Sequence, residues 1–192
     1  MKTIEIKGSL RTELGKKSSK QIRKADSVPC VIYGKGENIH FFAHELAFKG
    51  LVYTPEVHLV DLNIDGEIYK TILQDIQFHP VSDRIIHADF VKIFDDKPVA
   101  ISVPISVHGN SVGVMAGGKL NIKKRKLKIK GLPKNLPESI PVDISNLKIN
   151  DSVKVGDLAM DNIEFLDANR SIVVTVATTR GAQKEATAAD KK

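Results

Sequence analysis

The sequence has little cysteine and no long apolar run. A single cysteine, Cys30, excludes an internal disulfide and a cysteine-based metal cluster. It lies in a β-like apolar stretch, so we expect a small buried side chain rather than a nucleophile. No apolar run approaches the roughly 20 residues that a membrane-spanning helix needs, and the N-terminus lacks the continuous apolar region of a secretion signal. We therefore expect a cytoplasmic protein with no membrane partner.

Acidic residues are scarce in two segments. The chain of 192 residues carries 29 Lys and Arg against 23 Asp and Glu, a formal charge of +6. Residues 2–24 hold eight bases and two acids, residues 119–130 hold seven bases and no acid, and residues 25–94 hold five bases and ten acids. A short basic run is most often a solvated loop. Two such runs in a chain with this asymmetry favour a polyanionic partner, namely nucleic acid.

Alternation of polar and apolar residues predicts a mainly β protein. With 42% hydrophobic residues, the chain can bury a sizeable core. Antiparallel strands are expected over residues 3–7, 60–64, 67–79 and 85–94, with a hairpin turn at Asp65-Gly66. Short helices are expected over residues 20–25, capped by Ser18 or Ser19, and near residues 45–49 before Gly50.

A polar run that ends in Pro98 predicts a domain boundary after residue 94. We expect one domain over residues 1–94, a second β-rich domain over residues 95–180, and a disordered tail over residues 181–192. Strands of the second domain are expected over residues 99–108, 127–130 and 171–176 because β-branched residues alternate or cluster there.

Patterns that could indicate catalysis or metal binding are weak. Residues 113–119 fit the first seven places of a phosphate-binding P-loop, but Leu120 stands where the magnesium-binding Ser or Thr is needed. His40 and His44 lie four apart in a strand-like segment with no third ligand nearby in sequence. No nucleophile elbow occurs, and the carboxylates form no evident acid/base pair. We expect no enzymatic activity, no cofactor and no metal.

The expected strand over residues 85–94 carries an informative polar face. His87 and Asp89 share one face of it, and the apolar residues between and after them share the other. The preceding strand places Asp75, Gln77 and His79 on one face in the same way. If the two strands pair, they assemble a platform of Gln, His and Asp side chains. Alternation alone predicts a merely solvated sheet face equally well.

Five sequence blocks in a fixed order resemble a known family. They are residues 10–16 (LRTELGK), 20–23 (KQIR), 29–34 (PCVIYG), 74–80 (QDIQFHP) and 87–90 (HADF). Together they resemble the L-twenty-five family of bacterial large-subunit ribosomal proteins, which bind 5S rRNA. Residues 113–118, 132–137 and 140–144 resemble its longer Ctc, or general-stress, branch. The resemblance implies a six-stranded antiparallel β-barrel with short helices, followed by a second β-rich domain.

The resemblance also implies a function and a set of RNA-binding residues. It implies a structural component of the 50S subunit, monomeric within the ribosome, that binds 5S rRNA through a sheet face, a basic loop and a helix. The basic run 119–130 is a candidate for contact with 23S rRNA or neighbouring subunit proteins. The alternative is a β-rich stress or interaction protein that meets ribosomes only transiently. The implied RNA contacts are Arg11, Arg23, Tyr33, His87 and Asp89. Residues implied to assist them are Lys16, Lys20 and Gln77.

Two departures from the family pattern affect details of these contacts. Lys20 stands where many members have Arg, and residues 25–27 replace a stretch that often contains glycine. The first change removes a guanidinium fork but keeps the charge. The second leaves the backbone contacts of that loop unspecified.

Overall fold

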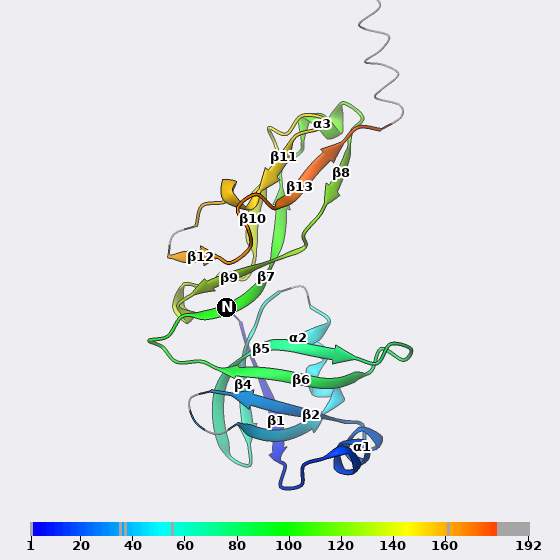
Figure 1. Cartoon of the computed structure of the whole chain (residues 1–192), viewed down its shortest axis with the longest axis vertical. Coiled ribbons are helices and arrows are strands. Elements are labelled where there is room, and N and C mark those ends of the chain that lie inside the picture. Colours follow the sequence, from blue (N-terminus) through cyan, green and yellow to red (C-terminus); the bar gives the residue numbers. More distant parts are fainter. Residues whose placement is uncertain (1, 35, 37, 55, 161, 180–192) are drawn as a thin grey trace, which may run out of the picture. The chain divides into compact units, whose positions relative to one another are not determined.

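The computed structural model describes residues 2–34, 36, 38–54, 56–160 and 162–179 (Figure 1). These residues form two compact units. The first holds the described residues up to Ile101 together with Leu132–Glu138, and the second holds Ser102–Gly131 and the described residues from Ser139 onward. The division into domains at residue 94 stays a prediction, and the expected tail over residues 181–192 lies outside the described residues. No described helix is long and apolar enough to cross a membrane.

The first unit is a closed six-stranded barrel with strand order β1-β3-β2-β6-β5-β4. The predictions of a mainly β fold and of this barrel are confirmed. Four of its strand pairs are antiparallel, but β1 pairs with β4 and β2 pairs with β6 in parallel. The prediction of a fully antiparallel barrel was therefore wrong. Tight hairpins force antiparallel pairing only between the strands they join, and the two parallel pairs join strands distant in sequence. The strands are β1 (Thr3–Leu10), β2 (Ser27–Tyr33), β3 (Ile39–His44), β4 (Leu59–Ile64), β5 (Glu67–Phe78) and β6 (Ile85–Lys92).

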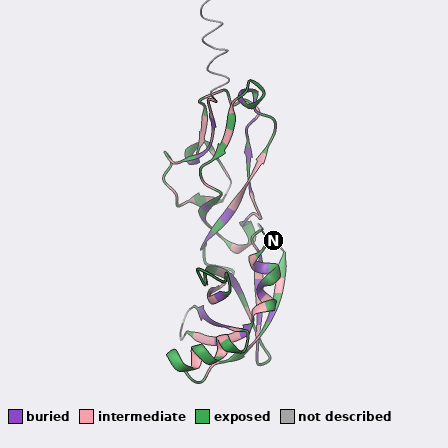
Figure 2. Cartoon of the chain, turned by 90° about the vertical axis from the view of Figure 1, so that its right-hand side faces the viewer, coloured by how far each residue is buried: buried purple, intermediate pink, exposed green. Residues whose placement is uncertain are grey.

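The barrel encloses one hydrophobic core. Alternate strand residues point inward, as on β4, where every second residue is buried, and Figure 2 shows this alternation along the ribbon. Near the centre, the Phe90 ring lies 5.9 Å from that of Phe41 and 6.4 Å from that of Phe48, measured between centroids. Cys30 is fully buried, as expected, and burial raises the pKa of its thiol. Since the inner positions are apolar, the polar residues are left to the outer face.

Two short helical turns follow β3. They are η1 (Glu45–Phe48), a 3₁₀ turn, and α2 (Lys49–Val52). The predicted helix near residues 45–49 is present, but it continues through Gly50, which therefore does not end it. Phe48 and Leu51 point into the barrel core from this segment, and their burial outweighs the weak helix propensity of glycine.

Helix α1 (Lys16–Lys24) packs against β2 on the outside of the barrel. It starts before the predicted Ser18 or Ser19 cap, and its N-cap is Gly15 at φ +127°. Both serines are occupied as donors, to the carbonyls of Glu13 and Gly15. No residue of α1 is buried. Hydrophobic burial therefore contributes little to holding this helix in place.

The turn after α1 contains a residue in the left-handed region. Asp26 has φ +51°, a conformation that glycine adopts at the lowest cost and that Asp tolerates better than most residues. It falls in the stretch where the sequence departs from the glycine often found in the resembling family. The departure therefore preserves the turn at a small conformational cost.

The second unit contains two small sheets. One has strand order β10-β7-β9-β12 and the other β11-β13-β8. The expected strands are present as β7 (Val99–His108), β9 (Lys126–Gly131) and β13 (Ile172–Ala177). The remaining elements of this unit are α3 (Val112–Met115), β8 (Lys119–Ile122), β10 (Ile140–Asp143), β11 (Ser152–Lys154), η3 (Val155–Asp157) and β12 (Ile163–Phe165), and the 3₁₀ turn η2 (Pro133–Asn135) belongs to the first unit.

The segment that fits the start of a P-loop is a closed turn. Helix α3 has four residues, and after it the Gly118 amide donates to the Gly113 carbonyl at 2.8 Å. A P-loop instead directs such amides at a phosphate and leads into a long helix. Here the segment leads into β8, so it does not have the P-loop conformation.

Candidate nucleic-acid interface

Strands β3, β2, β6 and β5 lie side by side, and Figure 1 shows the last three across the first unit. Their register aligns polar residues on the outer face. Asp89 lies opposite Asp75, and His87 lies opposite Gln77. On the other side of β6, Asp89 is beside Val31 of β2, which in turn is beside His40 of β3. We call this face the outer wall; its polar residues are Tyr33, His40, Asp75, Gln77, His87 and Asp89.

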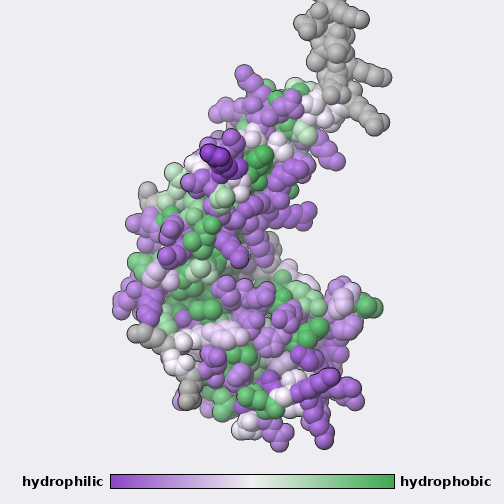
Figure 3. Space-filling view, viewed as in Figure 1, coloured by the Kyte–Doolittle hydropathy of each residue, from purple (hydrophilic) through white to green (hydrophobic). Residues whose placement is uncertain are grey.

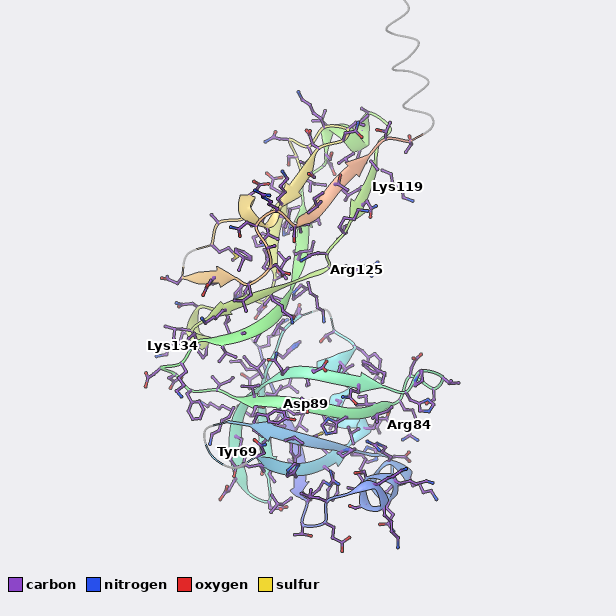
Figure 4. The ribbon with its side chains drawn as sticks, in the orientation of Figure 1. Tyr69, Arg84, Asp89, Lys119, Arg125 and Lys134 are labelled. Carbon is purple, nitrogen blue, oxygen red and sulfur yellow. The ribbon has the colours of Figure 1, made fainter. Side chains whose placement is uncertain are left out.

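Asp89 is the centre of the outer wall because it contacts Tyr33 and His87 and lies opposite Asp75, and Figure 4 labels it. Its Oδ1 accepts a hydrogen bond from the Tyr33 hydroxyl at 3.4 Å and lies 3.2 Å from Nδ1 of His87. The side chains of His87 and Asp89 are only 23% and 19% exposed. One carboxylate oxygen therefore holds two neighbouring side chains in fixed positions.

The electrostatics of the outer wall favour a neutral His87. Burial lowers the pKa of His87 in the first place, the Asp89 charge opposes that effect, and the charges of Arg23, Arg11 and His40 lower it further. Since a carboxylate can only accept, the contact with Asp89 places the ring proton on Nδ1 and leaves Nε2 as an acceptor. Burial and the same carboxylate raise the pKa of Tyr33, which keeps its hydroxyl protonated as a donor.

Arg11 joins the end of β1 to α1. Its backbone amide donates to the His40 carbonyl at 2.9 Å. Its guanidinium donates from Nη2 to Ser19 Oγ at 3.2 Å and to the Glu13 carbonyl at 3.5 Å. The buried Nε has no hydrogen-bond partner among the described residues. Before Arg11, the amide of Leu10 donates to the Asp65 carboxylate at 3.0 Å, which fixes the point where the chain leaves the barrel.

Arg23 joins α1 to β6. Its Nε donates to the Ile86 carbonyl at 3.0 Å, directly beside His87 in sequence. On the same helix, Lys16 and Lys20 are both exposed and lie four residues apart, so they share one helix face. Because α1 has no buried residue, the two arginine contacts are a main part of what holds this basic face beside the outer wall.

The structure brings the eight residues named from the sequence onto one unit. Tyr33, His87 and Asp89 are in contact, and Gln77 is the cross-strand neighbour of His87. The two arginines and two lysines belong to α1 or to the chain that leads into it. Sequence reasoning placed Asp75 on the polar face but did not name it as an RNA contact, and it did not select His40 or Ser19 for this site. The alternation of residues 39–44 could have placed His40 outward, but its approach to His87 depends on the β2–β3 register.

The outer wall and α1 together offer both donors and acceptors on a rigid support. The carboxylates and His87 Nε2 can accept from hydroxyl or amino groups, and the lysines and arginines can bind phosphates. An A-form RNA minor groove displays 2′-hydroxyls and base edges between two lines of phosphates. Figure 3 shows hydrophilic side chains interspersed with hydrophobic ones on this side of the unit. The chemistry therefore fits a folded RNA surface.

The basic run of the second unit lies on β8, β9 and the turn between them, where Figure 4 labels Lys119 and Arg125. On β9, lysines at every second position are exposed while Leu127 and Ile129 are fully buried. Lys124 pairs with Asp167 at 2.6 Å, and Lys130 lies 3.5 Å from Glu164. Two of the seven charges are thus partly offset, and the run remains strongly positive.

Comparison with known proteins gives matches over nearly the whole chain. The model of the ribosomal L25p family matches residues 6–90, and the model of the ribosomal protein TL5 C-terminal domain matches residues 98–180. A protein of Phocaeicola vulgatus named large ribosomal subunit protein bL25 is 46% identical over 198 aligned residues, covering 100% of both chains. Proteins with the same name from Porphyromonas gingivalis and Bacteroides thetaiotaomicron are each 44% identical, and the alignments cover 95% and 100% of this chain and 96% and 100% of theirs.

Proposed function

The chain belongs to the ribosomal L25p family, and on that premise we propose that it is a structural component of the large ribosomal subunit that binds 5S rRNA. The resemblance noted in the sequence, including the longer two-domain branch, is confirmed by these matches. Such a protein works in the cytoplasm as part of the ribosome, and its family is structural rather than enzymatic. The observation that carries the RNA-binding proposal is the single Asp89 oxygen that positions Tyr33 and His87 beside two arginines.

The outer wall supplies specificity in this proposal. Asp89 and His87 Nε2 accept from 2′-hydroxyls or from the exocyclic amino group of guanine in the minor groove. Gln77, across from His87, can donate and accept at once. Tyr33 is 41% exposed, and its ring offers a flat surface to a ribose or base while its hydroxyl donates to Asp89. A carboxylate repels phosphates, so the outer wall binds RNA only where hydroxyl or amino groups of the RNA donate to its carboxylates.

Helix α1 and Arg11 supply affinity. Arg23 uses Nε to bind the barrel, so its two terminal nitrogens can fork onto a phosphate or a guanine edge. Lys16 and Lys20 add charge that is sequence-independent and screened by salt. The finer partner assignments are part of the same proposal: 5S rRNA at the first unit, and 23S rRNA or neighbouring subunit proteins at residues 119–130.

A binding titration of the full chain tests the proposal. We expect 5S rRNA to bind more tightly than an unrelated structured RNA of equal length at the same salt concentration. Equal affinity for the two RNAs would contradict it. Sedimentation with intact large subunits in high salt then separates a resident component, which stays bound, from a protein that meets ribosomes transiently, which is lost.

A further inference from the structure

A cavity of about 210 Å³ opens at one end of the outer wall, between α1 and the turn that joins β5 to β6. We call it the turn cavity. Two of its lining residues, Arg23 and Ile86, are the hydrogen-bonded pair that fastens α1 to β6. Ile86 directly precedes His87, so the turn cavity adjoins the outer wall. Its lining residues are Arg23, Ser27, His79, Ser82, Arg84, Ile85 and Ile86.

The turn on one side of the cavity is held by its own hydrogen bonds. The His79 amide donates to the Arg84 carbonyl at 2.8 Å, and the Asp83 amide donates to the His79 carbonyl at 3.0 Å. The ring Nδ1 of His79 accepts from the amides of Val81 and Ser82 at 3.3 and 3.2 Å. Because Nδ1 accepts, the neutral ring carries its proton on Nε2. The Ser82 amide is thus engaged, while its hydroxyl has no hydrogen bond within the described part of the chain.

The opposite side is braced by Arg84. Its Nη2 lies 2.6 Å from Asp26 and 2.7 Å from Glu45, and its Nε lies 3.0 Å from the same Glu45 oxygen. The second Glu45 oxygen accepts from the Ile85 amide at 3.1 Å. Two carboxylates therefore offset the charge of Arg84. Arg84 thus stabilises the shape of the turn cavity and adds little to its net positive charge. Arg23 forms no ion pair with any described residue, so it supplies the uncompensated positive charge at the cavity.

The polar groups that line the turn cavity suit a phosphodiester. They are two guanidinium groups, an imidazole N–H and the hydroxyls of two serines, and no carboxylate is among these described lining residues. The Ser27 hydroxyl donates to the Ala25 carbonyl at 3.2 Å, so the Ser82 hydroxyl is the one left to donate to a ligand. A nucleobase edge would bring donors of its own to most of these groups, whereas a phosphodiester brings only acceptors and one negative charge. An RNA strand that crosses the outer wall at His87 would reach Arg23 and the turn cavity next. We propose that the turn cavity binds one backbone phosphate of that RNA. This inference rests on the proposed function.

Charge variants at Ser82 test the proposal on the full chain. Ser82 is exposed and its side chain has no contact to lose, so Ser82→Asp and Ser82→Lys should both fold, which thermal unfolding checks. Thr54, an exposed residue in the segment after α2, provides the control variants Thr54→Asp and Thr54→Lys, whose thermal unfolding is checked in the same way because they lose the hydrogen bond from the Thr54 hydroxyl to the Gly50 carbonyl at 2.9 Å. These have the same net charges at a position outside the turn cavity.

At roughly 0.1 M salt, we expect Ser82→Asp to weaken 5S rRNA binding about five- to tenfold, because an acid would lie within a few ångströms of the phosphate. Ser82→Lys should tighten binding and steepen the dependence of log K on log salt by roughly 0.7 to 0.9, the contribution of one added phosphate contact. The Thr54 variants should each change affinity less than about twofold, since screening weakens charges beyond about 10 Å.

Replacing single phosphates of the 5S rRNA by neutral methylphosphonates identifies the ligand atom. At one position, the replacement should weaken binding of the unchanged protein and abolish the effects of both Ser82 variants. Two results would overturn the phosphate site in the turn cavity: equal changes in affinity from the Ser82 and Thr54 variants, or no phosphate whose replacement abolishes the effects of the Ser82 variants. In either case the unchanged protein would still prefer 5S rRNA, so the proposed function would stand. Failure of the unchanged protein to prefer 5S rRNA would instead overturn the proposed function.

Discussion

Replacing Asp89 by Asn tests the centre of the outer wall. The side chain keeps its size, but the carboxylate that accepts from Tyr33 and contacts His87 Nδ1 becomes an amide. The amide oxygen can still accept from both neighbours, but the other carboxylate oxygen becomes an NH2 group that only donates. The charge that opposes the lowering of the His87 pKa is also lost. If Asp89 also accepts from the RNA, stranding a half-buried donor costs about 1 to 3 kcal/mol. This is a roughly 5- to 150-fold loss in affinity for 5S rRNA.

The same substitution should act with the opposite sign on an RNA that is bound only by charge. Removing a negative charge from a surface near phosphates reduces repulsion, so an unrelated RNA should bind equally well or slightly better. Filter-binding titrations with 5S rRNA and with the unrelated RNA, at one salt concentration, measure both changes. Asp61→Asn on β4, outside the outer wall, is the matched control because it makes the same change of charge. A parallel loss on both RNAs, or the same loss in the control, would refute the role given to Asp89.

Further predictions concern charge, pH and the core. Lys16→Ala and Lys20→Ala should each lower the slope of log K against log salt by roughly 0.7 to 0.9, as salt titrations measure, and should leave the preference between RNAs unchanged. Because burial lowers the pKa of His87 in the folded state, the unfolded state binds more protons between the two pKa values, and stability falls as pH decreases through the unfolded value of about 6.5. His87→Gln should therefore lose less thermal stability than the unchanged protein when the pH is lowered from about 7.5 to 5.5. Phe90→Ala removes a fully buried ring that packs against two others and should lower the free energy of unfolding by about 3 to 5 kcal/mol, measured by urea denaturation.

The strands and their faces could be predicted because side chains alternate with a period of two. His87 and Asp89 faced outward as expected, since Ala88 and Phe90 fill the core between and after them. The parallel strand pairs could not be predicted in this way, because alternation is the same in parallel and antiparallel strands. The predicted start of α1 was wrong because the sequence does not show which hydrogen bonds a serine will make. Ser18 and Ser19 can cap a helix, but here they donate to carbonyls of the preceding loop.

The brace around Arg84 shows what local patterns cannot reveal. Arg84 lies at the end of the β5–β6 turn and binds Asp26 after α1 and Glu45 after β3. Asp26 is 58 residues from Arg84 in the sequence and Glu45 is 39 residues from it. Glu45 also accepts from the amide of Ile85, the residue after Arg84. No spacing rule connects these positions, since only closure of the barrel brings the three loops together. The turn cavity depends on this closure and was accordingly invisible in the sequence.

The arrangement of α1 explains why arginine rather than lysine suits position 23. With no buried residue of its own, the helix needs a polar anchor on the barrel, and Arg23 provides it through Nε. The terminal nitrogens of the same guanidinium remain for a second acceptor, so one side chain can fix the helix and face the RNA. A lysine has one nitrogen on a flexible stem and would have to divide its donors between the Ile86 carbonyl and a phosphate with no fixed geometry. In the proposed complex, docking of the helix and recognition of RNA are coupled through this one planar group, and the basic face is positioned before the RNA binds.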